Sequence, residues 1–143
     1  MKTVFIKPAE VERKWFVIDA DGKILGRVAA KAASIVRGKE KAIFAPHQEV
    51  GDYVVVVNAG KIAVSGRKAQ QKIYYRHSGY VGGLKEIPYA KAAERHPTFP
   101  LEAAIKGMLP KGPLGRKLLK NVKVYSGPEH PHAAQNPQLI EVQ

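Results

Sequence analysis

Two short segments carry side chains of the kinds that bind metals or transfer protons. The segment Glu129–His132 offers one carboxylate and two imidazoles, enough for three ligands of a zinc ion. Its spacing matches no standard zinc site and the proline-rich tail around it offers little rigidity, so we expect no metal there. In the segment Arg76–Ser78 an imidazole lies beside a hydroxyl, but adjacent residues rarely face each other in a catalytic geometry. No serine of the chain lies in Gly-x-Ser-x-Gly either, so we expect no nucleophilic catalysis.

The strand, turn and helix expected near the N-terminus are where a nucleotide enzyme would carry its phosphate-binding glycines. A dinucleotide fingerprint requires Gly-x-Gly-x-x-Gly there, and the segment Asp21–Arg27 lacks that spacing. No stretch of the chain has the Gly-x4-Gly-Lys-Ser/Thr pattern of a P-loop. The absence of cysteine excludes disulfides, thiolate nucleophiles and Cys-ligated metals. We therefore expect neither a cofactor nor an enzymatic activity.

The charged residues give a much stronger signal. The 143 residues include 24 Lys and Arg against 12 Asp and Glu, a formal net charge of +12. Residues 61–125 alone hold 14 basic and 3 acidic side chains, hence a net charge of +11 (14 − 3). A concentrated positive field attracts polyanions, and neutralising phosphates releases their condensed counterions. Nucleic acid is therefore the expected partner. No apolar run is long enough for a membrane span, and no helix pairs a lysine face with a large apolar face.

Two basic segments are the best candidates for contacts with RNA. In Lys106–Lys120 the glycines bare the backbone, so that amide N–H groups can approach phosphates, and the prolines restrict its freedom. In Arg67–Arg76 the cations alternate with tyrosines, which suit stacking on unpaired bases and thus favour RNA over duplex DNA. Arg116 is the strongest single candidate, because a guanidinium can bridge two phosphate oxygens. The full set of expected RNA-binding residues is Lys39, Lys41, Arg67, Lys68, Lys72, Arg76, His77, Lys106, Lys111, Arg116, Lys117 and Lys120.

Apolar patterning predicts one α/β domain over residues 1–143. The 45% hydrophobic content is ample for a core. Strands alternate with helices, which indicates a parallel sheet with helices on its faces. The predicted strands are 15–19, 53–57 and 122–125, and the predicted helices are 24–38, about 88–95 and one opened by Pro100. Residues 72–77 are expected to form a strand or extended arm that leads into the glycine-rich turn 78–83. Residues 127–143 are expected to form an extended C-terminal tail on the surface.

The ordered set of motifs resembles bacterial large-subunit ribosomal protein thirteen. The segments that carry the resemblance are 15–20 (WFVIDA), 22–27 (GKILGR), 51–53 (GDY), 57–59 (VNA), 76–79 (RHSG), 106–116 (KGMLPKGPLGR), 122–127 (VKVYSG) and 130–135 (HPHAAQ). Together they span nearly the whole chain. The resemblance implies a three-layer α/β/α domain with a small, mostly parallel sheet and basic loop extensions, located in the cytoplasmic ribosome. It also implies binding to large-subunit ribosomal RNA of the 23S type, early in subunit assembly, beside neighbouring ribosomal proteins and without catalysis.

Two other classes of function stay open at this point. A small α/β enzyme acting on nucleotides or RNA would also use a basic surface, to collect its substrate. Its acidic candidates, Asp19, Asp21, Glu49 and Asp52, are too scattered in sequence to indicate a shared site. A DNA-binding architectural protein would use the same charges on a duplex. A nuclease assay and a comparison of RNA with DNA affinity distinguish these alternatives.

Overall fold

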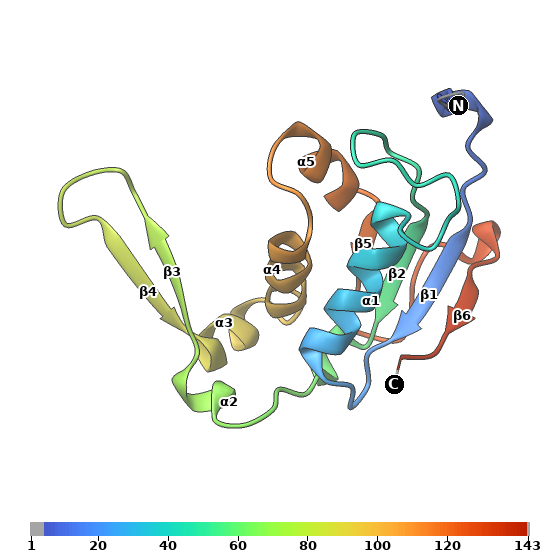
Figure 1. The fold of residues 1–143 in the computed structure, drawn as a ribbon. Helices are drawn as coiled ribbons and strands as arrows, with labels where there is room; N and C mark the ends of the chain where they lie inside the picture. The colour runs from blue at the N-terminus through green and yellow to red at the C-terminus, as the bar shows by residue number, and fades with distance from the viewer. Residues whose placement is uncertain (1–4, 143) are drawn as a thin grey trace.

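A four-stranded sheet with all its strand pairs parallel forms the centre of the molecule. The computed structural model describes residues 5–142 (Figure 1). The strand order is β5-β2-β1-β6, with β1 at Trp15–Asp19, β2 at Tyr53–Val57, β5 at Val122–Val124 and β6 at Gln138–Ile140. The β-branched run of β2 is buried between two neighbouring strands, as expected of a central parallel strand. The predicted α/β class and parallel sheet are confirmed.

Three helices cover one face of this sheet (Figure 1). They are α1 (Leu25–Arg37), α4 (Phe99–Met108) and α5 (Pro113–Leu119). The alanines of α1 favour helix and allow close packing, and its buried face meets Leu101 and Ile105 of α4 in the core. Gly38 ends α1 in the left-handed conformation, with φ 79°, at the residue where the predicted helix 24–38 ends. These helices and the strands they cover make up the rigid body of the protein.

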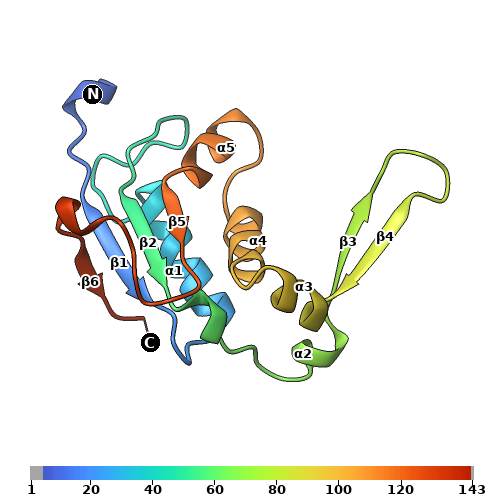
Figure 2. The same cartoon turned by 180° about the vertical axis from the view of Figure 1, so that it is seen from behind.

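The C-terminal segment passes over the opposite face of the sheet (Figure 2). His132 stacks on Trp15, with ring centroids 5.0 Å apart, and the short turn η3 (Ala133–Gln135) follows. The chain then enters the sheet, because β6 pairs in parallel with β1. The tail was expected to lie extended on the surface, and β6 is extended and mostly exposed, but its pairing with the sheet was not expected from the sequence. Pairing covers the free edge of β1, and it lets Val142 become buried.

A β-hairpin projects away from this body (Figures 1 and 2). Its antiparallel strands are β3 (Ile73–His77) and β4 (Leu84–Pro88), joined by the glycine-rich turn that the sequence predicted. The strand β4 was missed, because Lys, Glu and Pro in it are weak strand formers. Two short helices, α2 (Lys68–Gln71) and α3 (Tyr89–Arg95), flank the hairpin at its base.

Two further 3-10 turns, η1 (Pro8–Glu10) and η2 (Ala59–Lys61), complete the described elements. Across residues 5–142, every helix falls short of the length and apolar character that crossing a lipid bilayer requires.

Candidate nucleic-acid interface

The fold separates the basic residues into two groups. The hairpin cluster consists of Arg67, Lys68, Lys72, Arg76 and His77, on α2 and β3. The α5 cluster consists of Lys106, Lys111, Arg116, Lys117 and Lys120, on the end of α4 and on α5 with its flanking loops. In both clusters every residue is exposed except Lys72, which is half-buried. The hairpin and α5 lie apart (Figure 2). At the base of the hairpin the clusters approach each other, because Lys68 and Lys72 line one cleft with Gly107, which follows Lys106 at the end of α4.

The pairing of the hairpin strands brings a further cation into the hairpin cluster. Arg76 lies directly opposite Lys85 in the antiparallel register. Like charges at such a position repel each other, and an anion between them would relieve that repulsion. Sequence reasoning missed Lys85, because its place opposite Arg76 depends on the unpredicted strand β4. The pair is well placed to hold one phosphate group.

The hairpin is held to the body at its base by aromatic packing. Tyr74 makes an edge contact with Phe99 of α4, with centroids 5.1 Å apart, and stacks on Tyr89 of α3 at 6.4 Å. The Lys72 ammonium lies over the Tyr74 ring, 5.3 Å from its centroid. Burial raises the pKa of Tyr74 above its usual value. The neighbouring Tyr75 is 63% exposed, because successive side chains of a strand point to opposite faces.

The α5 cluster stands on a backbone with little freedom. Gly112 has a φ of 113°, which a residue with a side chain rarely adopts, and Pro113 follows in the first turn of the helix. Gly115 lies against the carbonyl group of Pro110, where no Cβ atom would fit. Leu118 is fully buried in the core. The exposed cations Lys111 and Arg116 are thus carried on a tightly fixed loop and helix.

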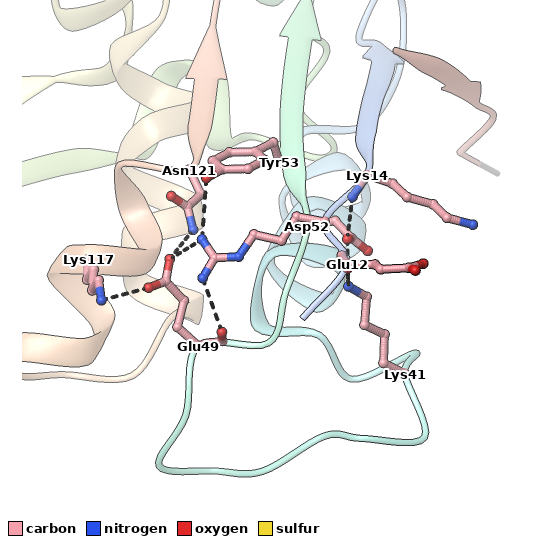
Figure 3. A network of polar contacts seen from close by, with 9 residues as sticks. Glu12, Lys14, Lys41, Glu49, Asp52, Tyr53, Lys117 and Asn121 are labelled. Carbon is pink, nitrogen blue, oxygen red and sulfur yellow. Dashed lines mark hydrogen bonds and ion pairs between the residues drawn. The ribbon is translucent and has the colours of Figure 1, made fainter. Parts of the chain in front are cut away.

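A network of polar contacts around Glu49 ties the α5 cluster to the body (Figure 3). Glu49 Oε2 accepts a hydrogen bond from Lys117 Nζ at 2.9 Å, and Oε1 accepts one from Asn121 Nδ2 at 2.7 Å. Arg13 Nη1 lies 3.2 Å from Oε1 and also donates to the Tyr53 hydroxyl. Burial alone would raise the pKa of Glu49, but the hydrogen bonds from Asn121 and Lys117 and the charge of Arg13 lower it overall. Glu49 therefore stays ionised at neutral pH.

Of the two basic residues expected next to the first helix, Lys41 already binds acceptor groups of the protein itself. Lys41 is half-buried, and its Nζ lies 2.7 Å from Asp52 Oδ1 and donates to the Glu12 carbonyl at 2.7 Å. Asp52 also accepts the backbone N–H of Lys14 at 2.8 Å. These contacts give Lys41 a role in joining the 39–52 connection to the approach of β1 (Figure 3). Lys39, in contrast, is exposed.

The histidines of the C-terminal segment contact aromatic side chains and each other. His132 Nε2 lies 2.7 Å from the Tyr125 hydroxyl, and the backbone N–H of His132 donates to His130 Nδ1 at 3.2 Å. Burial lowers the pKa of His132, and the charges of His130 and Lys123 lower it further. Within the described residues 5–142, no three His, Asp or Glu side chains are placed to hold a metal ion. The arrangement is that of a packed histidine pair.

A rigid α/β body that presents two exposed basic clusters has the form of a nucleic-acid-binding protein. The family model for ribosomal protein L13 matches residues 13–131. The Treponema denticola large ribosomal subunit protein uL13 is 66% identical over 99% of this chain and 100% of its own length. The proteins of the same name from Nitrosospira multiformis and Agathobacter rectalis are 58% and 55% identical, each over 99% of both chains. The chain belongs to the ribosomal protein L13 family.

Proposed function

We propose that this protein is a structural constituent of the large ribosomal subunit that binds large-subunit ribosomal RNA of the 23S type. The observation that carries the proposal is the pair of exposed basic clusters on a body of this family's fold. Ribosomal protein L13 is a family of structural proteins, not enzymes. The proposed partners are ribosomal RNA and neighbouring large-subunit proteins, and the proposed location is the cytoplasmic ribosome. The protein is also proposed to bind the ribosomal RNA early in subunit assembly and to support that assembly.

The two clusters have different tasks in this proposal. The α5 cluster contacts phosphates with fixed side chains and with the backbone amides of its glycines. The hairpin cluster reaches a second RNA segment, where Arg76 and Lys85 share a phosphate and the exposed Tyr75 and Tyr80 stack on unpaired bases. Since the hairpin strands and α5 lie apart, one protein molecule joins two RNA segments and stabilises their relative placement. Such work requires a rigid body and no chemical step.

The proposed RNA contacts are the residues expected from the sequence together with Lys85. Arg116 remains the leading single residue, because it is exposed on α5 and its planar guanidinium can bind two phosphate oxygens. Lys41 and Lys117 differ from the rest, since each already pairs with a carboxylate of the protein. Their part in binding RNA is therefore combined with a part in holding the fold.

The salt dependence of RNA binding tests this assignment. Alanine at Lys111, Arg116, Lys117 and Lys120 should weaken binding to transcribed large-subunit ribosomal RNA. It should also flatten the plot of log affinity against log salt by roughly one unit for each lost phosphate contact. A matched control replaces Lys7, Lys14, Lys61 and Lys123, which lie outside the clusters and carry the same total charge.

Equal slopes for the α5-cluster variant and the control would contradict the assignment, because they would mean that only the total charge matters. Affinities for structured RNA and duplex DNA at the same salt concentration test the kind of nucleic acid. Stronger binding to the duplex would contradict the proposal.

A further inference from the structure

Glu49 is a nearly buried carboxylate in an otherwise basic region. Its side chain is 8% exposed, and it collects donors from three separate segments of the chain. Arg13 comes from the approach to β1, Lys117 from α5, and Asn121 from the approach to β5. A buried carboxylate keeps its charge only when such partners compensate for the lost hydration. Removing the charge of Glu49 would therefore release contacts in three places.

Lys117 contacts the buried Glu49 and is at the same time exposed to solvent. Its Nζ lies 2.9 Å from Glu49 Oε2, yet its side chain is 69% exposed. An ammonium group has three donors, and Glu49 occupies one of them. The remaining donors can therefore reach an anion outside the protein. A cleft of about 360 Å³ adjoins this place and is lined by Lys117, Arg13, His47 and Leu114 among others.

We infer that Glu49 is a positioning residue for RNA binding, which fixes Lys117 so that its ammonium bridges the buried carboxylate and a phosphate of the RNA. The inference rests on the proposed function. Without the carboxylate, the four-carbon side chain of Lys117 would sample many rotamers, and binding RNA would then have to fix one of them. Glu49 fixes the rotamer of Lys117 before the RNA binds.

The sign of the effect separates this inference from simple electrostatics. Replacing Glu49 with Gln keeps the shape of the side chain and raises the net charge by one. If attraction between charges were the whole effect, the variant would bind every polyanion more tightly. If Glu49 positions Lys117, the variant binds its specific RNA more weakly, whereas its binding to an unstructured polyanion is unchanged or stronger.

The experiment measures the affinity of Glu49→Gln for transcribed large-subunit ribosomal RNA and for poly(U) at the same salt concentration. We expect a loss of roughly three- to tenfold on the ribosomal RNA, the size of one hydrogen bond, and no loss on poly(U). The matched control is Glu40→Gln, which removes the same charge and one ion pair. Glu40 is exposed and pairs with Lys31 of α1 at 2.6 Å, so its ion pair involves neither Glu49 nor Lys117.

Combining Glu49→Gln with Lys117→Met tests whether Glu49 acts through Lys117. In the Lys117→Met background, Glu49→Gln should cause no further loss of ribosomal RNA affinity, because the two residues act as one unit. Thermal unfolding of each variant identifies any that fails to fold, and Glu49→Asp, which keeps the charge, should recover part of the affinity.

Equal or tighter binding of Glu49→Gln to ribosomal RNA, or additive losses in the double variant, would overturn the inference and leave the proposed function intact. Failure of the unaltered protein to prefer ribosomal RNA over poly(U) would instead contradict the proposed function.

Discussion

The sheet body and the β3–β4 hairpin are stabilised in opposite ways. In the body, Val54, Val55 and Val56 of β2 have no exposed surface, and Leu101 and Ile105 of α4 are equally buried. In the hairpin, Tyr80 is 81% exposed and Val81 at the turn is fully exposed. A lone two-stranded hairpin is marginally stable in water, so its base contacts through Tyr74 are what hold it.

This difference indicates what each region is for. Burial of apolar side chains explains the residues at the core of the body. Burial explains little of the hairpin beyond Tyr74 and its neighbours, so the cations and exposed aromatics beyond that base need an external partner to account for them. The body determines the fold, and in the proposed function the hairpin extends the reach of the protein toward RNA.

The largest expected effect is the loss of stability when the body core is truncated. Leu101→Ala should lower the free energy of unfolding by about 2–5 kcal/mol, since it leaves a cavity in close packing. Leu84→Ala in the hairpin removes the same atoms from an exposed side chain and should change it by less than about 0.5 kcal/mol. Urea unfolding measures both. Similar values for the two variants would contradict the division into body and arm.

The next largest effect is expected on RNA binding, from removing the two opposed cations of the hairpin, without a loss of stability. Replacing both Arg76 and Lys85 with Ala should weaken binding to large-subunit ribosomal RNA and flatten its salt dependence by about one unit if they share one phosphate. The thermal midpoint should stay the same or rise slightly, because two opposed cations are removed. Filter binding at several salt concentrations measures the slope. An unchanged slope would mean that Arg76 and Lys85 do not contact phosphates of the RNA, and the hairpin would then not belong to the interface.

A smaller effect is expected from pH on the C-terminal segment that covers the body. The folded-state pKa of His132 lies below its ordinary value of 6.5, because burial disfavours the imidazolium. The unfolded chain therefore binds the proton more readily, and the stability present above pH 6.5 is lost as the pH falls through the folded-state pKa.

Hydrogen exchange of residues 130–142 should thus quicken relative to the body core between pH 7 and pH 5, after correction for the intrinsic pH dependence of exchange. His132→Gln should reduce that difference. Protection that increases in acid would mean that the imidazolium is favoured in the fold.

The smallest effect concerns the base of the hairpin. The Tyr74 hydroxyl is buried and has no hydrogen-bond partner among the described residues. Tyr74→Phe removes only this hydroxyl, so we expect stability to be unchanged or to rise by up to about 1 kcal/mol. Tyr74→Ala would also remove the ring that packs on Phe99 and should free the hairpin. Differential scanning calorimetry compares the two. A clear loss with Phe would show that the hydroxyl has a partner.

The sequence predicted the body well, because its signals are local. The Val run of β2, the apolar face of α1 and the helix-ending Gly38 each follow from the spacing of a few residues. The strand β6 could not be predicted, since Gln138–Ile140 is a short segment whose strand character comes from pairing with β1, more than a hundred residues earlier. The strand β4 was missed for a different reason, because Lys85, Glu86 and Pro88 within it are weak strand formers.

The candidate site was predictable in composition but not in arrangement. Counting charges along the sequence identifies the segments that hold the cations, because this requires no knowledge of tertiary contacts. The placement of Lys85 opposite Arg76 depends on the register of the β3–β4 hairpin. The convergence of Arg13, Lys117 and Asn121 on Glu49 arises from tertiary contacts between distant segments. Glu49 drew attention only as an isolated acid, and no local pattern signals its part in a network.

Ultraviolet crosslinking in growing cells, followed by sequencing of the attached RNA and mapping of the attached peptides, tests the central claim most directly. We expect large-subunit ribosomal RNA on peptides from two places, residues 67–85 of the hairpin region and residues 106–120 around α5. Crosslinks to the hairpin and α5 from different RNA segments would show that the protein joins them. Crosslinks confined to other RNAs, or to peptides outside both clusters, would contradict the account.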